Sequence, residues 1–164
     1  VTELVRLGRF PWRGTLGRWR KEDEQIIAQA MQETGVTAFK DILADQLSGG
    51  ERQRTWVAML LAQQAELLIL DEPTSALDIH HQYQLMELLS NLNKSTAKGV
   101  IVILHDLNLA LRFATQIVAL KAGKVAFSGE AALLQNEQRL SDLYATPVTL
   151  IDHPKQDHKV AIVC

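Results

Sequence analysis

The feature that most limits the fold is a pair of short apolar runs that each stop abruptly at polar residues. Residues 67–70 end in Asp71 and Glu72, and residues 100–104 end in His105. Apolar runs of this length, separated by a long amphipathic helix, predict two buried strands that are covered on both faces. Helices that alternate with such strands predict an α/β architecture with a parallel sheet, whose ligands bind outside the carboxyl ends of the strands.

The rest of the sequence predicts further helices and a hairpin. Apolar residues recur at helical spacing, and glycine, serine or aspartate stands where a helix would begin or end. Residues 116–120 and 124–128 flank a tight turn at Ala122-Gly123 and predict a β-hairpin. The segment after Pro147 yields no firm assignment. The expected helices cover residues 2–7, 22–34 (closed by Gly35), 48–63, 79–92 and 106–113, and two short helices run through to Tyr144.

Composition excludes several classes of protein. The chain has 164 residues, of which 47% are hydrophobic and 22% are charged, as in an ordinary soluble globular domain. The formal net charge of -2 argues against a globally basic nucleic-acid binder. The single cysteine, Cys164, excludes a cysteine-based zinc framework. No apolar stretch approaches the ~20 residues that are needed to cross a bilayer.

Two explanations fit the sequence Ser48-Gly49-Gly50-Glu51. A serine followed three residues later by a glutamate forms a capping box at many helix starts. The paired glycines would also leave the backbone N–H groups of this helix start unshielded. Such groups, together with the positive end of the helix dipole, suit an anion such as phosphate. The four residues alone are consistent with both explanations.

The polar residues at the strand ends also allow a structural and a catalytic interpretation. Asp71 and Glu72 can be solvated turn acids before Pro73; alternatively, Asp71 serves a magnesium ion and Glu72 orients and polarises an attacking water. His105 can be a hydrogen-bonded loop histidine beside the helix cap Asp106. The other histidines lack metal-ligand spacing, so we predict no zinc site and expect surface or packing roles for His80, His81, His153 and His158.

Four segments, taken in their order along the chain, resemble the ATP-binding-cassette (ABC) ATPases. LSGGERQR at 47–54 is similar to the family signature, LLILDE at 67–72 to its Walker B strand, SALD at 75–78 to its D-loop, and His105 to its switch histidine. The resemblance covers essentially the whole chain. GRFPW at 8–12, DEPTSALDIHHQ at 71–82 and LHDLNLA at 104–110 resemble the ATPase subunits of bacterial importers for ferric siderophores, of the ferrichrome or hydroxamate type, and related iron or cobalamin chelates.

This resemblance implies an incomplete P-loop NTPase-type parallel sheet core with an ABC-specific helical subdomain. We expect residues 1–64 to form the helical subdomain with the signature, and residues 65–164 to form the C-terminal part of the RecA-like ATPase core. The sequence contains no G-x-x-x-x-G-K-[ST] phosphate loop (Walker A); in the family, that loop and the Q-loop lie upstream. The chain is therefore expected to be the C-terminal part of a longer subunit, with negligible ATPase activity by itself.

The resemblance also implies a role for each motif residue. In the family two subunits pack head to tail, so that each nucleotide lies between the Walker motifs of one subunit and the signature of the other. Mg²⁺ and ATP are the implied cofactors. The residues implied are Ser48, Gly49, Gly50, Glu51 and Gln53 for ATP held mainly by the partner, Asp78 for coupling of the two sites, Asp71 for Mg²⁺, Glu72 for the attacking water and His105 for the terminal phosphate.

The family further implies partners and a place of work. The partners are a second ATPase subunit, an integral membrane permease and, indirectly, a periplasmic or lipoprotein chelate-binding protein. The expected location is the cytoplasmic face of the bacterial plasma membrane, where the subunit would be peripheral. Binding to nucleic acid is not expected.

An N-terminal segment that mixes basic and aromatic residues leaves rival hypotheses open. Basic side chains neutralise phosphate and aromatic rings stack on bases, so the segment can be a nucleic-acid platform, a solvated stretch beside a helix, or a docking surface for a permease helix, as the family implies. Rival functions are an ABC ATPase of DNA repair or of the ribosome, although the sustained heptads or cysteines of repair proteins are absent, and a truncated non-catalytic subunit. The segment comprises Arg6, Arg9, Phe10, Trp12, Arg13, Arg18, Trp19, Arg20 and Lys21.

Overall fold

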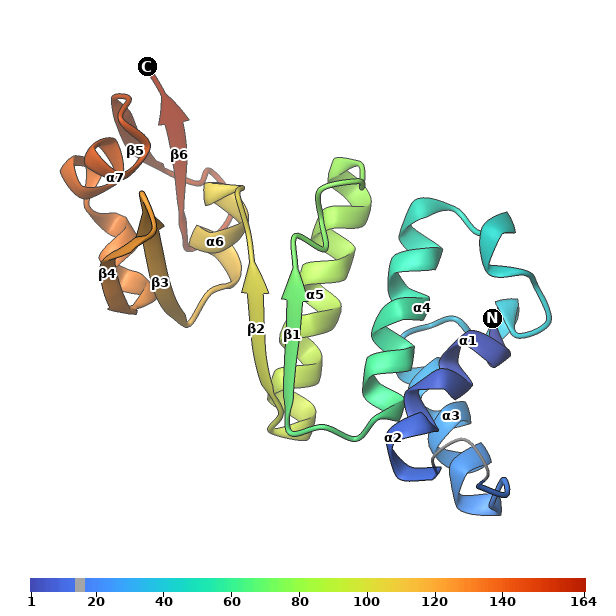
Figure 1. Ribbon diagram of the computed structural model, residues 1–164. Helices are drawn as coiled ribbons and strands as arrows, with labels where there is room; N and C mark the ends of the chain where they lie inside the picture. Colours follow the sequence, from blue (N-terminus) through green and yellow to red (C-terminus); the bar gives the residue numbers. More distant parts are fainter. Residues whose placement is uncertain (14–16) are drawn as a thin grey trace. The chain divides into compact units, whose positions relative to one another are not determined.

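The computed structural model describes residues 1–13 and 17–164 and divides into two compact units, Val1–Ile103 and Leu104–Cys164 (Figure 1). The first unit contains helices and a parallel pair of strands, and the second contains two β-hairpins and short helices. The predicted α/β architecture is confirmed. The division into residues 1–64 and 65–164 stays a prediction. Within the described part of the chain, no helix is both long enough and apolar enough to cross a bilayer.

The helical part of the first unit is arranged around α4 (Gly49–Ala62). Helices α1 (Thr2–Arg6) and α3 (Lys21–Glu33) contact it, and Val57 is fully buried in α4. Gly35, with a φ of 69°, follows α3 in the left-handed conformation that the sequence predicts for a helix end. The other elements here are the 3₁₀ helices η1 (Leu7–Arg9), η2 (Thr37–Phe39) and η3 (Ala44–Gln46) and the short helix α2 (Phe10–Arg13).

A buried ion pair joins the N-terminal segment to both α3 and α4. Arg9 Nε donates to Asp23 Oδ1, and Arg9 Nη1 donates to Ala62 O and Gln64 Oε1, all at 2.9 Å. The two charged side chains are only 8% and 5% exposed. Burial opposes ionisation of Asp23, but the hydrogen bond from Arg9 and its positive charge hold the pKa of this carboxyl below its ordinary value. The pair therefore fixes η1 against α3 and against the C-terminal end of α4.

Strands β1 (Leu67–Asp71) and β2 (Gly99–Ile103) form the predicted parallel pair, with Leu67 opposite Gly99 and Asp71 opposite Ile103. Helix α5 (Ile79–Thr96) connects them and lies alongside the strands (Figure 1). Its apolar face is buried through Leu85, Met86, Leu89 and Leu92.

The prediction that both strands are covered on both faces is wrong. Leu68 and Leu70 are 2% and 5% exposed, whereas Ile69 is 60% and Ile101 50% exposed. Successive side chains of a strand point to opposite faces, so only the face of this pair that carries Leu68 and Leu70 is buried. The other face remains open to solvent among the residues that the structure describes.

The second unit consists of two antiparallel hairpins and helices that share one core. Strands β3 (Gln116–Lys121) and β4 (Lys124–Glu130) form the predicted hairpin, and Ala122 and Gly123 have the positive φ values, 49° and 73°, of a tight turn. Strands β5 (Val148–Asp152) and β6 (Lys159–Val163) form the second hairpin, which the sequence did not reveal. Helices α6 (Leu107–Phe113), η4 (Ala131–Gln135) and α7 (Glu137–Tyr144) complete the unit, and its core contains Ala110, Leu134, Leu140 and Val148.

The Arg9–Asp23 pair leads to a stability prediction. We expect Asp23→Asn to lower the free energy of unfolding by about 3 kcal/mol, because breaking a buried ion pair leaves one charge without its counter-charge. Urea unfolding of the purified protein at pH 7 measures this loss. The matched control is Glu24→Gln, which removes the half-exposed partner of Arg6 and should cost at most about 1 kcal/mol.

The same substitution has an expected pH dependence. Because the pKa of Asp23 is lowered on folding, its stabilising contribution is present above the unfolded-state pKa of about 3.9. The contribution is lost as the pH falls through the folded-state pKa. The difference between wild type and Asp23→Asn should therefore shrink below about pH 4, and a difference that stays constant to pH 2.5 would contradict this account.

Candidate functional site

Helix α4 begins with the predicted capping box. Ser48 Oγ accepts a hydrogen bond from the Glu51 N–H (3.4 Å), and Glu51 Oε2 accepts hydrogen bonds from the Ser48 hydroxyl (2.7 Å) and N–H (2.8 Å). The hydrogen bond from the hydroxyl, followed by that from the N–H, lowers the pKa of the Glu51 carboxyl. The capping interpretation is confirmed, and the hydroxyl proton of Ser48 is directed at Glu51. Binding of phosphate at this helix start stays a prediction.

The expectation that both glycines at this helix start are unshielded is wrong for Gly50. Gly49 is exposed, whereas Gly50 is buried beneath the ring of His81. A Cβ atom placed on Gly50 would lie 2.8 Å from His81 Cγ and nearer still to Cδ2, whereas a Cβ on Gly49 would meet Leu77 Cδ2 at an ordinary 3.5 Å. The cause is the packing of the first turn of α5 against the first turn of α4.

Asp71 and Glu72 both lie exposed at the carboxyl end of β1, as predicted. Glu72 has a φ of 45°, in the left-handed region that few non-glycine residues adopt. Its N–H donates to Ile103 O (3.2 Å), and its C=O accepts from the Ser75 N–H (3.2 Å) and hydroxyl (3.0 Å). These bonds hold Glu72 in a backbone conformation of the kind that is concentrated at functional sites.

Asp78 caps helix α5 and binds the ring of His81. Its carboxylate accepts a hydrogen bond from the His81 N–H (2.9 Å), and its two oxygens lie 2.8 and 2.9 Å from His81 Nδ1. The backbone hydrogen bond and then that of the ring lower the pKa of Asp78. The side chain of Gln82 donates to Thr74 O (3.2 Å) and Leu77 O (3.0 Å). The loop between β1 and α5 is therefore fastened to the first turns of α5.

Gln53 and His105 complete the set of predicted residues. Gln53 is half-buried in α4, and His105, in the second unit, is exposed. His105 precedes Asp106, which caps α6 by accepting hydrogen bonds from the Asn108 N–H (2.7 Å) and the Leu109 N–H (3.1 Å). The predicted cap is confirmed, and the nucleotide-binding roles of Gln53 and His105 stay predictions.

The structure brings two of the predicted motifs into contact, the start of α4 and the segment that ends at Asp78. The sequence alone does not indicate this contact, because its principal side chain, His81, is expected there to have an ordinary surface or packing role. The signal for it is the spacing of Asp78 and His81, since a helix-capping aspartate can reach the side chain three residues later. Nothing local to the sequence indicates that the ring then lies on Gly50.

The acids of the site suit a magnesium ion only together with a nucleotide. No group of three or more His, Cys, Asp or Glu side chains that could hold a metal ion occurs in the described ranges, 1–13 and 17–164. Protein sites for Mg²⁺ usually supply one or two carboxylates and leave the other positions to substrate phosphates and water. The exposed Asp71 carboxylate fits that pattern.

Several side chains of the basic and aromatic N-terminal segment contact other groups of the protein. Arg9 is buried against Asp23, and the guanidinium of Arg13 lies 3.5 Å from the same carboxylate and 3.6 Å from the centre of the Trp19 ring. The Trp12 indole N–H donates to a backbone carbonyl just beyond α4, although the residue is 62% exposed. The interpretation as a solvated stretch is wrong for Arg9 and Arg13, whose charges are engaged by Asp23.

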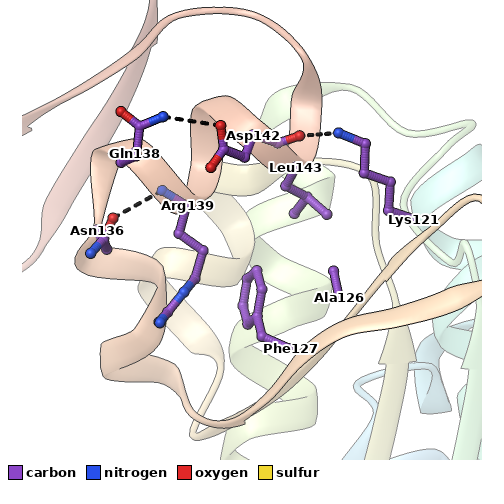
Figure 2. Close-up of a pocket in the computed structure, with 8 residues that line it drawn as sticks. All are labelled: Lys121, Ala126, Phe127, Asn136, Gln138, Arg139, Asp142 and Leu143. Atoms are coloured by element: carbon purple, nitrogen blue, oxygen red, sulfur yellow. Dashed lines mark hydrogen bonds between the residues drawn. The ribbon is translucent and has the colours of Figure 1, made fainter.

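A surface pocket of about 450 Å³ lies in the second unit between α7 and the β3–β4 hairpin (Figure 2). The Arg139 guanidinium lies 5.1 Å from the Phe127 ring centre, and Lys121 Nζ donates to Asp142 O. The cations of the pocket therefore already contact neighbouring groups. No residue predicted to bind nucleotide lines this pocket.

A family pattern and sequence relatives agree with the ABC resemblance of the motifs. The pattern of the ABC transporter family matches residues 3–75. The ferric enterobactin transport ATP-binding protein FepC of Escherichia coli (strain K12) is 45% identical over 154 residues, which make up 94% of this chain and 57% of that protein. Residues 3–75 therefore carry an ABC transporter domain, and 94% of the chain is similar to an ATP-binding protein of an iron-chelate transporter.

Another relative and a solved structure agree with this family. The iron(3+)-hydroxamate import ATP-binding protein FhuC of Bacillus subtilis (strain 168) is 40% identical over 162 residues, which cover 99% of this chain and 60% of that protein. An inward-facing metal-chelate type ABC transporter superposes with a TM-score of 0.92 at 25% identity, over 99% of this chain and 65% of the other. The chain therefore spans 57% and 60% of the length of the two sequence relatives.

The packing at the signature helix predicts different outcomes for its two glycines. Gly50→Ala should lower the free energy of unfolding by about 1–3 kcal/mol, because its Cβ overlaps the His81 ring and forces repacking. Gly49→Ala should leave stability unchanged or raise it by up to about 1 kcal/mol, because alanine favours a helix. Urea unfolding of both purified variants makes the comparison. Equal stability of the two variants would show that the His81 ring does not lie on Gly50.

Proposed function

We propose that this chain forms part of the ATP-hydrolysing subunit of a bacterial importer for a ferric siderophore or a related iron chelate. The observation that carries the proposal is the signature segment itself. In a chain 45% identical to a ferric enterobactin transport ATP-binding protein, this segment forms a capped helix start with Ser48 and Gly49 exposed. The narrower hydroxamate class is supported by the likeness to FhuC.

The start of α4 is suited to the terminal phosphate of ATP. Backbone N–H groups at a helix start have no partner within the helix, and the helix dipole adds positive potential there. Ser48 can contribute a hydroxyl donor once it rotates away from Glu51 Oε2, its present acceptor at 2.7 Å. Glu51 would then retain the Ser48 N–H, which keeps the helix start closed. Gln53 lies in the same first turns and would contact the nucleotide from there.

The end of β1 is suited to the attacking water and the metal. Asp71 would hold Mg²⁺, which neutralises charge on the phosphates when it is bound. Glu72 would accept a proton from the attacking water. Its left-handed backbone conformation sets the point from which the carboxylate side chain extends. His105 would donate a hydrogen bond to the terminal phosphate. These roles divide the chemistry between positioning and electrostatic stabilisation, on which phosphoryl transfer mainly depends.

Hydrolysis would be shared between two subunits. The signature helix would reach the nucleotide of a second ATPase subunit packed head to tail, and Asp78 would couple the two sites. The helical part that carries Trp12 and Phe10, which are 62% and 53% exposed, would contact a cytoplasmic segment of a membrane permease. A binding protein on the other side of the membrane would supply that permease with chelate. The subunit would therefore be peripheral, on the cytoplasmic face of the plasma membrane.

The decisive variant of the full-length gene product is Glu72→Gln. Removing a general base lowers turnover by about 10²–10⁴-fold, so kcat for ATP hydrolysis in the transporter complex should fall by at least about 100-fold while Mg-ATP binding is retained. Uptake of iron from ferric siderophore by cells that carry only this variant should be lost in parallel.

Glu66→Gln is the matched control for this experiment, because Glu66 is an exposed acid just before β1. Its ATPase activity and uptake should stay within about twofold of wild type, the scale expected of a surface substitution without a specific role. Full activity of Glu72→Gln, or an equal loss in both variants, would refute the catalytic assignment. An ATPase that is active but does not respond to any ferric chelate would refute the substrate assignment alone.

A further expectation concerns the 164-residue chain assayed by itself. We expect it to bind Mg-ATP weakly and to release phosphate at the background rate, because its sequence contains no glycine-rich loop with a lysine to hold the β- and γ-phosphates. Phosphate release by the purified chain tests this expectation. Turnover above background that disappears in Glu72→Gln would show that the chain carries a complete site.

A further inference from the structure

We propose that His81 is a positioning residue that links the Asp78 turn to the phosphate-binding start of α4 within one subunit. The inference rests on the proposed function, because it assigns His81 a role in the same ATP site. It concerns a residue that does not itself touch the nucleotide. His81 acts through two other residues, Gly50 on one side and Asp78 on the other.

The contact with Gly50 requires a glycine. The His81 ring fills the space that a Cβ on Gly50 would occupy, with Nε2, Cγ and Cδ2 all within 3.0 Å of that position. Gly50 is consequently buried although it lies in the first turn of an otherwise accessible helix start. An aromatic ring that lies directly on a backbone leaves little freedom for either group to move, since packed atoms resist displacement. The ring therefore sets the distance between the Gly50 backbone and the first turn of α5.

The contact with Asp78 fixes the ring itself. Both carboxylate oxygens of Asp78 lie within 2.9 Å of Nδ1, and Oδ1 also accepts the His81 N–H at 2.9 Å. A hydrogen bond at Nδ1 sets both the orientation and the protonated nitrogen of an imidazole. Any displacement of Asp78 must therefore turn the ring, and any turn of the ring must press on Gly50 or move away from it.

Neighbouring contacts show that the rest of the turn is held in the same way. A Cβ on Gly49 would meet Leu77 Cδ2 at 3.5 Å and Ala76 O at 3.7 Å, so the turn lies along the helix start. Gln82 fastens the turn to α5 through the carbonyls of Thr74 and Leu77. The turn is thus held between α5 and the start of α4, and the His81 ring adds the contact with Gly50.

This arrangement has a consequence for hydrolysis. Misplacing a binding group by about 1 Å can cost about 10²-fold in rate, and the N–H groups at the α4 start are proposed to meet phosphate held by another subunit. A ring wedged between Asp78 and Gly50 keeps the D-loop turn and these N–H groups at a fixed separation. Loss of the ring should therefore affect turnover more than the initial binding of ATP, most of which the partner's motifs would provide.

The matched control is His80, the neighbouring histidine. It is exposed and contacts the His81 ring only edge to face, at 5.4 Å between centres. In the full-length ATPase with its permease, His81→Ala should lower kcat about 10-fold with less than about threefold change in KM for ATP. His80→Ala should change neither parameter by more than about twofold. His81→Gln, which can donate to Asp78 again, should recover part of the lost kcat, and this recovery would not be expected if the ring merely filled space.

A double substitution tests the contact with Gly50 directly. The Cβ of Gly50→Ala clashes with the ring, and His81→Ala removes the ring, so the losses of kcat in the double variant should not multiply. The double variant should be no slower than Gly50→Ala alone. If His81→Ala fails to assemble with the permease, the comparison of His81→Gln with His80→Ala carries the same test.

The outcomes separate this inference from the function on which it rests. If Glu72→Gln abolishes hydrolysis but His81→Ala and His81→Gln behave like wild type, the role of His81 is refuted and the ATPase assignment stands. The same holds if the losses of kcat in Gly50→Ala and His81→Ala multiply. If Glu72→Gln hydrolyses ATP at the wild-type rate, the proposed function itself is wrong. A fall in melting temperature of His81→Ala with an unchanged kcat would also overturn the proposal, since it would leave His81 a purely structural residue.

Discussion

Helix α4 is held at both ends by charged or polar contacts with distant parts of the first unit. At its C-terminal end the buried Arg9 guanidinium donates to Ala62 O and is neutralised by Asp23. At its start the capping box closes the first turn, and His81 lies on Gly50. The placement of α4, and with it of the proposed phosphate site, is therefore set by contacts at both ends of the helix.

The backbone at the end of β1 is also held in a constrained conformation. Glu72 adopts a left-handed conformation that costs a non-glycine residue roughly 1–2 kcal/mol, and hydrogen bonds to Ile103 and Ser75 hold it there. The chain then passes through a turn that is fastened to α5 and to the start of α4. Glu72, the candidate acid for the attacking water, and the start of α4, the candidate phosphate site, are thus connected through this turn. The role proposed for His81 follows from this continuity.

Local patterns in the sequence predicted the local features well. The Ser48–Glu51 box, the Asp106 cap and the Ala122-Gly123 turn all depend on residues within a few positions of one another, and all three are confirmed. Burial could not be predicted in that way. Ile69 and Ile101 are exposed although their runs look like central strands, because burial depends on whether a second layer is present. Gly50 is buried by the ring of His81, 31 positions later, and Arg9 pairs with Asp23, 14 positions later. No short-range sequence pattern indicates either contact. The β5–β6 hairpin escaped prediction because its strands carry no short turn signal between them.

We propose that the start of α4 binds the terminal phosphate of a nucleotide, and that acids of another subunit hold the metal ion and the attacking water of that nucleotide. The most direct test is a structure of the full-length protein with its partner, trapped with Mg-ATP. We expect Ser48 and the Gly49 N–H of one subunit to lie within hydrogen-bonding distance of the terminal phosphate, with Asp71 and Glu72 of the opposite subunit beside the same nucleotide. A trapped complex in which the α4 start faces solvent, or in which these acids point away from the nucleotide, would contradict it.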